Sequence, residues 1–126
     1  MAPTTLIVDD HRLFRTSARL LLEAEGYDVV GEAEDGASAV AAAERLHPDV
    51  VVLDVQLPDM TGFAIARELL ERELVGRIVL VSSRHASEYG EQVGDSGAVG
   101  FIAKDELSGA ALHSLLSPEE GRDATP

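Results

Sequence analysis

The chain has 126 residues, 45% of them hydrophobic and 26% charged, which predicts one globular domain with its own core and excludes two domains of ordinary size. Because it has no cysteine, a disulfide framework, a thiolate metal site and a cysteine nucleophile are excluded. The formal net charge of -13 disfavours binding of this segment to nucleic acid or an anionic membrane, and no apolar run has the length of a membrane span or a signal peptide. We expect a cytoplasmic protein.

Five short apolar runs predict strands, and they alternate with segments of helical periodicity. The strands are predicted at 4–8, 28–33, 50–53, 77–81 and 98–103. Apolar residues recur at helical spacing between 13 and 24, and an alanine-rich helix is predicted over 37–46, before Pro48. Helices are also predicted over 63–73 and 107–115, with Asp105 as the N-cap of the last one.

The segment 87–97 and the C-terminal tail carry the weakest structural signals. Gly90 and Gly94 each cost a helix about 1 kcal/mol relative to alanine, so 87–97 is predicted to form only a short, marginal helix. The tail 117–126 has no apolar residue large enough to pack, and we expect it to be disordered. The domain is therefore predicted to span residues 1–116.

Strict alternation of strands and helices predicts an α/β fold, a doubly wound parallel sheet with helices on both faces. In such a sheet the functional crevice lies beyond the carboxyl ends of the strands. Four of the five predicted strands end in polar groups that can bind ions or phosphate. These groups are Asp9 and Asp10, Asp54, Ser82 and Ser83, and Lys104, the only lysine of the chain.

Three carboxylates at one site repel one another, and a single lysine does not neutralise them. Mg²⁺ does so with oxygen ligands from carboxylates and water, and one carboxylate then remains available as a nucleophile. Phosphoryl transfer to that carboxylate needs positive charge and hydrogen-bond donors, which Lys104, Ser82 and backbone N–H groups offer. No GxxxxGK[ST] motif occurs, so ATP is not expected as the direct donor.

Each of these residues also has a simpler interpretation on its own. In these interpretations Asp10 caps a helix that begins near Arg12 and Asp54 is a turn residue. Ser82 ends a strand, and Lys104 is a solvated surface lysine. Their joint occurrence at the same ends of alternating strands favours a functional site. The four histidines are scattered and do not predict a zinc site, and His11 is expected at the start of the first helix.

Four segments carry a resemblance to a known family: IVDDH at 7–11, DVVVLDVQLPDMTG at 49–62, VLVSS at 79–83 and GFIAKDE at 100–106. With them, roughly residues 4–116 resemble a bacterial two-component response-regulator receiver domain. VDDH followed by LFR, and KDE after the fifth strand, resemble most the receivers fused to a helix-turn-helix DNA-binding domain. The resemblance implies a flavodoxin-like (βα)5 fold with strand order 2-1-3-4-5.

The resemblance also implies roles for the acidic residues. Asp54 is the expected phosphoacceptor, which takes a phosphoryl group from a sensor histidine kinase, from a phosphotransfer protein or from a small donor such as acetyl phosphate. The expected ligands of Mg²⁺, or of Mn²⁺ in its place, are Asp10, Asp54 and the backbone carbonyl of Gln56, with Asp9 acting largely through water.

On the other side of the site, the resemblance implies that Lys104 pairs with Asp54 at rest and with a phosphoryl oxygen afterwards. Ser82 is the expected switch hydroxyl, with Ser83 beside it, and Phe101 occupies the place of the family's switch aromatic. Helix four, strand five and helix five, roughly 86–116, are the expected output face. A downstream protein, a DNA-binding effector domain outside this chain or a second copy would bind there, and we expect either a single-domain regulator or a receiver separated from its effector.

Gln56 and Arg84 lie two residues beyond the acceptor and the switch hydroxyl, at positions that flank the phosphoryl group in the family. We predict that they influence how water reaches the acyl phosphate; the alternative is that both side chains point into solvent.

Three functions remain as hypotheses. The first is a phosphorylation-activated signalling switch that catalyses only its own phosphorylation and dephosphorylation. The second is a Mg²⁺-dependent aspartyl-phosphate phosphatase. The residue Gln56 argues against it, because such enzymes carry a second aspartate at this position. The third is a phosphorylation-independent binding module, which the complete set of polar residues argues against.

Overall fold

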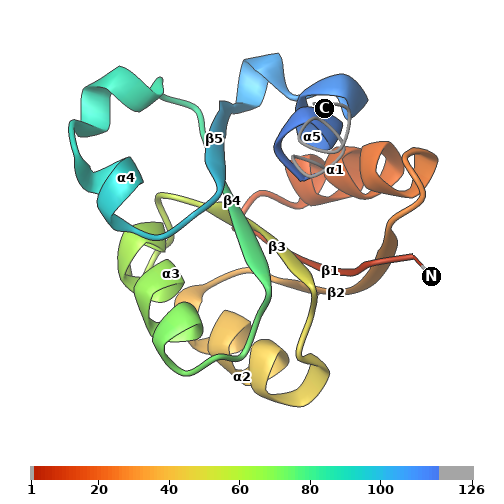
Figure 1. The fold of residues 1–126 in the computed structure, drawn as a ribbon, viewed down its shortest axis with the longest axis horizontal. Coiled ribbons are helices and arrows are strands. Elements are labelled where there is room, and N and C mark those ends of the chain that lie inside the picture. The colour runs from red at the N-terminus through yellow and green to blue at the C-terminus, as the bar shows by residue number, and fades with distance from the viewer. Residues whose placement is uncertain (1, 117–126) are drawn as a thin grey trace, which may run out of the picture.

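The computed structural model describes residues 2–116, which form one parallel sheet with helices on both faces (Figure 1). The strand order is β2-β1-β3-β4-β5, so the predicted flavodoxin-like, doubly wound fold is confirmed. The strands are β1 (Thr4–Val8), β2 (Asp28–Ala33), β3 (Val50–Asp54), β4 (Arg77–Ser82) and β5 (Gly100–Ala103). The helices are α1 (Arg12–Ala24), α2 (Gly36–Leu46), α3 (Gly62–Glu71), α4 (Gln92–Asp95) and α5 (Gly109–Leu116), with 3₁₀ turns η1 (Ala86–Tyr89) and η2 (Lys104–Glu106). The tail 117–126, for which we expect disorder, lies outside the described residues.

The two faces of the sheet bury alternate residues of each strand, because successive side chains point to opposite sides. Figure 1 shows α1 and α5 on one face and α2 and α3 on the other. Toward α2 and α3 the buried strand residues include Leu6, Val8, Val51, Leu53, Ile78 and Leu80, and toward α1 and α5 they include Ile7, Val50, Val52, Val79 and Val81. Each such side chain contributes about 1.5–3 kcal/mol by burial, so the central strands hold their carboxyl ends in place.

Local polar signals start the helices, with one correction to the sequence prediction. Asp35 caps α2, where its side chain accepts the backbone N–H of Ser38 at 2.8 Å. The predicted N-cap Asp105 is wrong, because residues 104–106 form η2 and the last helix begins one turn later. Ser108 has that role instead, since its hydroxyl accepts the backbone N–H of Ala111 at 3.0 Å.

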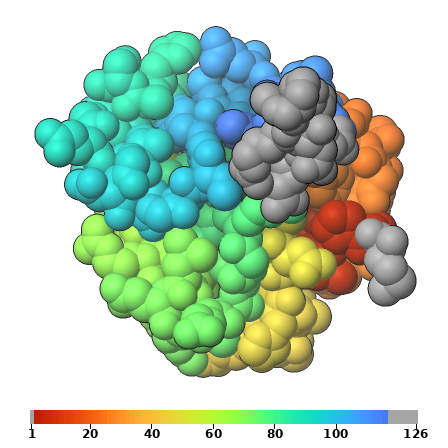
Figure 2. All heavy atoms as spheres, in the orientation of Figure 1, coloured from red at the N-terminus to blue at the C-terminus, as the bar shows by residue number. Residues whose placement is uncertain are grey.

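The segment between β4 and β5 is the least regular part of the described chain. It contains η1 and α4, four residues each, and neither element contains a buried residue. Gly90, with φ of 62°, ends η1, so one continuous helix over 87–97 does not form. In Figures 1 and 2 this segment lies beside α3 at the edge of the molecule. The predicted short, marginal helix is confirmed.

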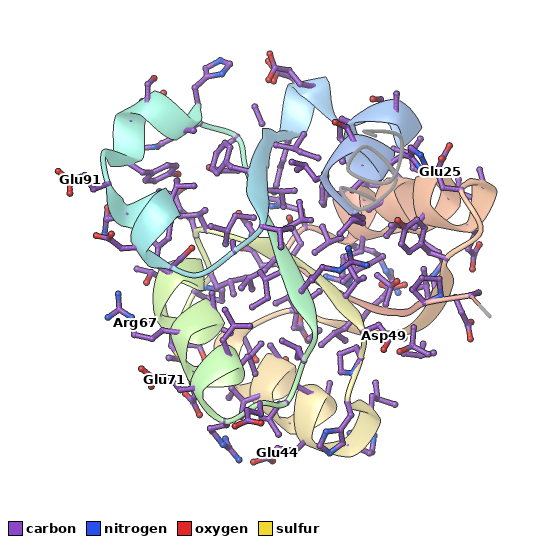
Figure 3. The ribbon with its side chains drawn as sticks, viewed as in Figure 1. Glu25, Glu44, Asp49, Arg67, Glu71 and Glu91 are labelled. Atoms are coloured by element: carbon purple, nitrogen blue, oxygen red, sulfur yellow. The ribbon has the colours of Figure 1, made fainter. Side chains whose placement is uncertain are left out.

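The surface carries most of the charge. In Figure 3 the labelled side chains of Glu44, Arg67, Glu71 and Glu91 point away from the core. Such an acidic surface repels the phosphates of nucleic acid. Within residues 2–116, no helix combines the length and the apolar character that crossing a bilayer requires.

Candidate functional site

The carboxyl end of β1 places Asp9 in the interior and Asp10 at the surface. Asp9 is fully buried, and its Oδ1 accepts the backbone N–H of His11 at 2.8 Å. The Asp10 carboxylate lies 3.1 Å from His11 Nδ1. His11 is the N-cap residue of α1 and makes no side-chain cap, so the simpler interpretation of Asp10 as the cap of this helix is excluded.

Asp54 is the last residue of β3, and only 3% of its surface is exposed. Its Oδ1 accepts the backbone N–H of Gln56 at 3.2 Å. The start of α3 approaches the strand end so closely that a Cβ atom on Gly62 would lie 2.3 Å from the Asp54 backbone oxygen. Glycine at this position therefore lets the loop 55–61 fold back against the strand that carries Asp54.

Lys104 follows β5 and reaches both buried carboxylates. Its Nζ lies 2.7 Å from Asp9 Oδ2 and 3.4 Å from Asp54 Oδ2. The contact with Asp54 has hydrogen-bond geometry, whereas the shorter contact with Asp9 is an ion pair without it. Asp9 Oδ2 is therefore buried with an ammonium nearby but no hydrogen bond. The ring of Phe14 in α1, whose centroid is 4.6 Å from Nζ, adds a cation–π contact.

Negative charge is in excess at these strand ends. Burial raises the pKa of Asp54 to about 6, with a further rise from the charge of Asp9 and an opposing effect of Lys104 and of the Gln56 N–H. Ligand atoms of Asp9, Asp10, His11 and Asp54 all lie within 4.8 Å of one another. Carboxylate oxygens are the ligands that Mg²⁺ prefers, so this donor set and the buried Asp9 Oδ2 fit the predicted cation.

The end of β4, together with Phe101 of β5, forms the opposite side of the site. Ser82 is fully buried, and its Oγ accepts the backbone N–H of Arg84 at 3.0 Å and lies 2.7 Å from the hydroxyl of Tyr89. Ser83 and Arg84 are exposed, and Phe101 is half-buried. The ring centroids of Phe101 and Tyr89 are 5.9 Å apart. Tyr89 therefore contacts both Ser82, the predicted switch hydroxyl, and Phe101, the predicted switch aromatic.

Three residues of this region were not predicted as part of a site. His11 was expected only as a helix start, yet it contacts the acidic pair, and Phe14 of the same helix contacts Lys104. The position of His11 directly after the acidic pair is a signal that sequence reasoning could have used. No local signal marks Tyr89, because its partners come from β4, α3 and β5.

A parallel sheet of this order, with acids after β1, an aspartate ending β3, a hydroxyl ending β4 and a lysine after β5, defines the class of receiver domains. Residues 5–116 match the response regulator receiver domain family, and the chain belongs to it. The predicted family is thus confirmed. The DNA-binding transcriptional activator EvgA of Escherichia coli is 37% identical over 116 residues, which cover 92% of this chain and 57% of that protein.

Solved structures agree with this assignment. A LuxR-family two-component response regulator from Aurantimonas is 30% identical, with a TM-score of 0.80, over 90% of this chain and 81% of that one. The chemotaxis response regulator CheY4 of Vibrio cholerae is 26% identical, with a TM-score of 0.80, over 92% of this chain and 100% of that one. The chain spans about half the length of the curated relatives it matches, because it covers 57%, 49% and 52% of three of them.

Proposed function

We propose that the chain is a phosphorylation-activated signalling switch in which Asp54 accepts a phosphoryl group. The donor is the phosphohistidine of a sensor histidine kinase or a phosphotransfer protein, or a small molecule such as acetyl phosphate. An oxygen of the Asp54 carboxylate forms a bond to phosphorus as the bond from phosphorus to the donor breaks. With phosphohistidine a phosphorus–nitrogen bond breaks and the imidazole keeps the electron pair; with acetyl phosphate a phosphorus–oxygen bond breaks and acetate leaves with the electron pair. The observation that carries this proposal is one ammonium group, Lys104, shared by the two buried carboxylates of Asp9 and Asp54.

Asp9, Asp10, Asp54 and the backbone carbonyl of Gln56 are the groups we assign to Mg²⁺, with Mn²⁺ as a substitute. When bound, the ion supplies positive charge to the oxygens of the transferred group. Lys104 supplies a second positive charge. Its longer contact, 3.4 Å, is the one with Asp54, so it can turn toward a phosphoryl oxygen and keep its 2.7 Å contact with Asp9.

Ser82 and Ser83 are the hydroxyl donors in this proposal, and Gln56 and Arg84 control the approach of water to the acyl phosphate. The Arg84 backbone is anchored through its N–H to Ser82 while its side chain is exposed, which leaves that side chain free to lie over the phosphoryl group. Replacing Gln56 and Arg84 together by alanine should therefore change the dephosphorylation rate. An unchanged rate would remove both residues from the proposal.

The proposed output is the face formed by α4, β5 and α5, with Phe101 as the switch aromatic. A downstream protein, an effector domain or a second copy of the chain would bind there. The name of the relative EvgA describes a DNA-binding activator, which supports an effector of that kind. The net charge of -13 argues that the receiver itself does not contact the DNA. We place the switch in the cytoplasm.

Phosphorylation of Asp54 is tested with the purified chain, Mg²⁺ and acetyl phosphate, followed by intact-mass analysis. We expect one phosphoryl adduct, its loss when EDTA removes the metal and its complete loss in Asp54→Asn. Asp105→Asn is the matched control, because this exposed aspartate follows Lys104 and should leave the adduct unchanged. Rapid repeated release of phosphate would favour a phosphatase instead, and no adduct from any donor would favour a phosphorylation-independent module.

A further inference from the structure

Tyr89 occupies a position between the two residues that the proposed switch requires. It belongs to η1, seven residues after Ser82 in the chain, and its hydroxyl lies 2.7 Å from Ser82 Oγ. Its ring packs edge-on against Phe63 of α3, with centroids 5.3 Å apart, and at 5.9 Å against Phe101 of β5. The half-buried side chain of Tyr89 thus contacts β4, α3 and β5, although no residue of η1 is fully buried.

A count of donors and acceptors indicates the direction of the Ser82–Tyr89 hydrogen bond. Ser82 is fully buried, and one lone pair of its Oγ already accepts the N–H of Arg84. Its hydroxyl hydrogen needs an acceptor, and among residues 2–116 the structure gives it only the oxygen of Tyr89. If Tyr89 donated instead, a buried donor on Ser82 would stay unpaired, at a cost of about 1–3 kcal/mol. Ser82 therefore donates, and the half-buried Tyr89 directs its own hydrogen elsewhere.

We propose that Tyr89 is a positioning residue that withholds the Ser82 hydroxyl from the site until Asp54 is phosphorylated. This inference rests on the proposed function. A phosphoryl oxygen is charged and is a stronger acceptor than a phenol, so the Ser82 hydrogen turns from Tyr89 to the phosphoryl group. No covalent bond changes in this step; one hydrogen bond replaces another. The Ser82–Tyr89 bond thus opposes formation of the phosphorylated state.

Release of Tyr89 has a consequence for the surface next to the acceptor. Tyr89 and Gln92 form one wall of a groove of about 470 Å³, and the loop that follows Asp54, residues 55–61, forms the other. No residue of η1 or α4 is fully buried, and besides Tyr89 only the partly buried Val93 of these two elements packs against the core. Phe101, which packs against the Tyr89 ring, gains room at the same time. Tyr89 therefore couples the phosphoryl group to both the groove and β5.

The test compares Tyr89→Phe, which keeps the ring and removes only the hydroxyl, with the wild type. The dissociation constant of beryllofluoride, a phosphoryl mimic, is measured in the presence of Mg²⁺. Loss of one competing hydrogen bond should tighten binding by about threefold to tenfold. The same substitution in a Ser82→Ala background should have no effect, because the hydroxyl that Tyr89 withholds is then absent. An unchanged constant in Tyr89→Phe, or an equal change in both backgrounds, would overturn the inference.

A second readout follows Tyr89 directly. The chain has no tryptophan and two tyrosines, Tyr27 and Tyr89, so tyrosine fluorescence reports on few groups. Beryllofluoride should change the wild-type emission, and the change should be lost in Tyr89→Phe. Emission that changes equally in both proteins would contradict release of Tyr89. If the wild type binds beryllofluoride and forms the adduct but Tyr89→Phe behaves identically, only this inference fails; if the wild type does neither, the proposed function fails with it.

Discussion

The two sides of the site differ in how firmly the fold holds them. On one side, Asp9 and Asp54 end the central strands β1 and β3, are buried, and share the ammonium group of Lys104. On the other side, Ser82 is followed by η1 and α4, which have four residues each, contain no buried residue and are separated by Gly90 at positive φ. The side that would bind the ion and the phosphoryl group is fixed by the core, whereas the side that would respond to it is loosely attached.

This difference has a physical reason. The proposed phosphoryl transfer to Asp54 would need groups whose positions do not change, because catalytic charges act best when they are preorganised. A switch needs an element with two arrangements of similar free energy. In a segment with few buried contacts, the free-energy difference between two arrangements is small. The buried strands provide the first property and the glycine-interrupted segment provides the second.

The largest effect on stability is expected at Gly62, on the firm side. A Cβ atom there would lie 2.3 Å from the Asp54 backbone oxygen, so Gly62→Ala should lower the free energy of unfolding by about 3 kcal/mol. Gly90→Ala is the matched variant on the loose side. No atom lies within 4 Å of its Cβ position, so only the backbone conformation is disfavoured, at about 1 kcal/mol. Urea denaturation measures both, and equal losses would contradict the comparison.

A smaller effect of opposite sign is expected for Asp54→Asn without metal. The pKa of Asp54 is raised from 3.8 to about 6, so the folded protein binds a proton that the unfolded chain releases, and ionised Asp54 lowers stability as pH rises. The substitution Asp54→Asn, whose side chain stays uncharged, should therefore increase the free energy of unfolding by about 2–3 kcal/mol at pH 8. The gain should shrink as the pH falls through about 6 and vanish below about 4.

Urea denaturation in EDTA across this pH range measures the effect, with the exposed Asp105→Asn as the control. Adding Mg²⁺ should narrow the difference in free energy of unfolding between wild type and Asp54→Asn. The wild type keeps the Asp54 carboxylate and should bind the ion more tightly, so the ion stabilises its folded state more. A gap that stays constant with pH would show that ionised Asp54 does not destabilise the fold.

The smallest effect is expected on the loose side, at Gly94 in α4. Its Cβ position contacts nothing within 4 Å, so Gly94→Ala should favour the helix by about 0.5–1 kcal/mol without a clash. Amide hydrogen exchange should slow in α4 and stay unchanged in β1 and β3. Ser87→Ala, at an exposed position of η1, is the control and should leave exchange in α4 unchanged. Slower exchange throughout the sheet would show that the two sides are not independent.

Much of this arrangement was predictable from the sequence. Runs of branched residues predicted the strands, and polar residues at their carboxyl ends predicted that Asp9, Asp54 and Lys104 meet, because parallel strands end at one edge. The N-cap of α5 was not predictable in the same way, because Asp105 and Ser108 are both good caps and only the turn η2 decides between them. Contacts between side chains of separate elements, such as Phe14 with Lys104, left no local pattern.

The sequence by itself determined the order and kind of the elements and the identity of the charged residues, because hydrophobic periodicity and residue chemistry are local properties. Only the tertiary structure decided that Lys104 lies closer to Asp9 than to Asp54, and that the hydroxyl groups of Ser82 and Tyr89 are hydrogen-bonded. Those choices depend on distances between strands and turns far apart in the chain, which packing of the whole core sets.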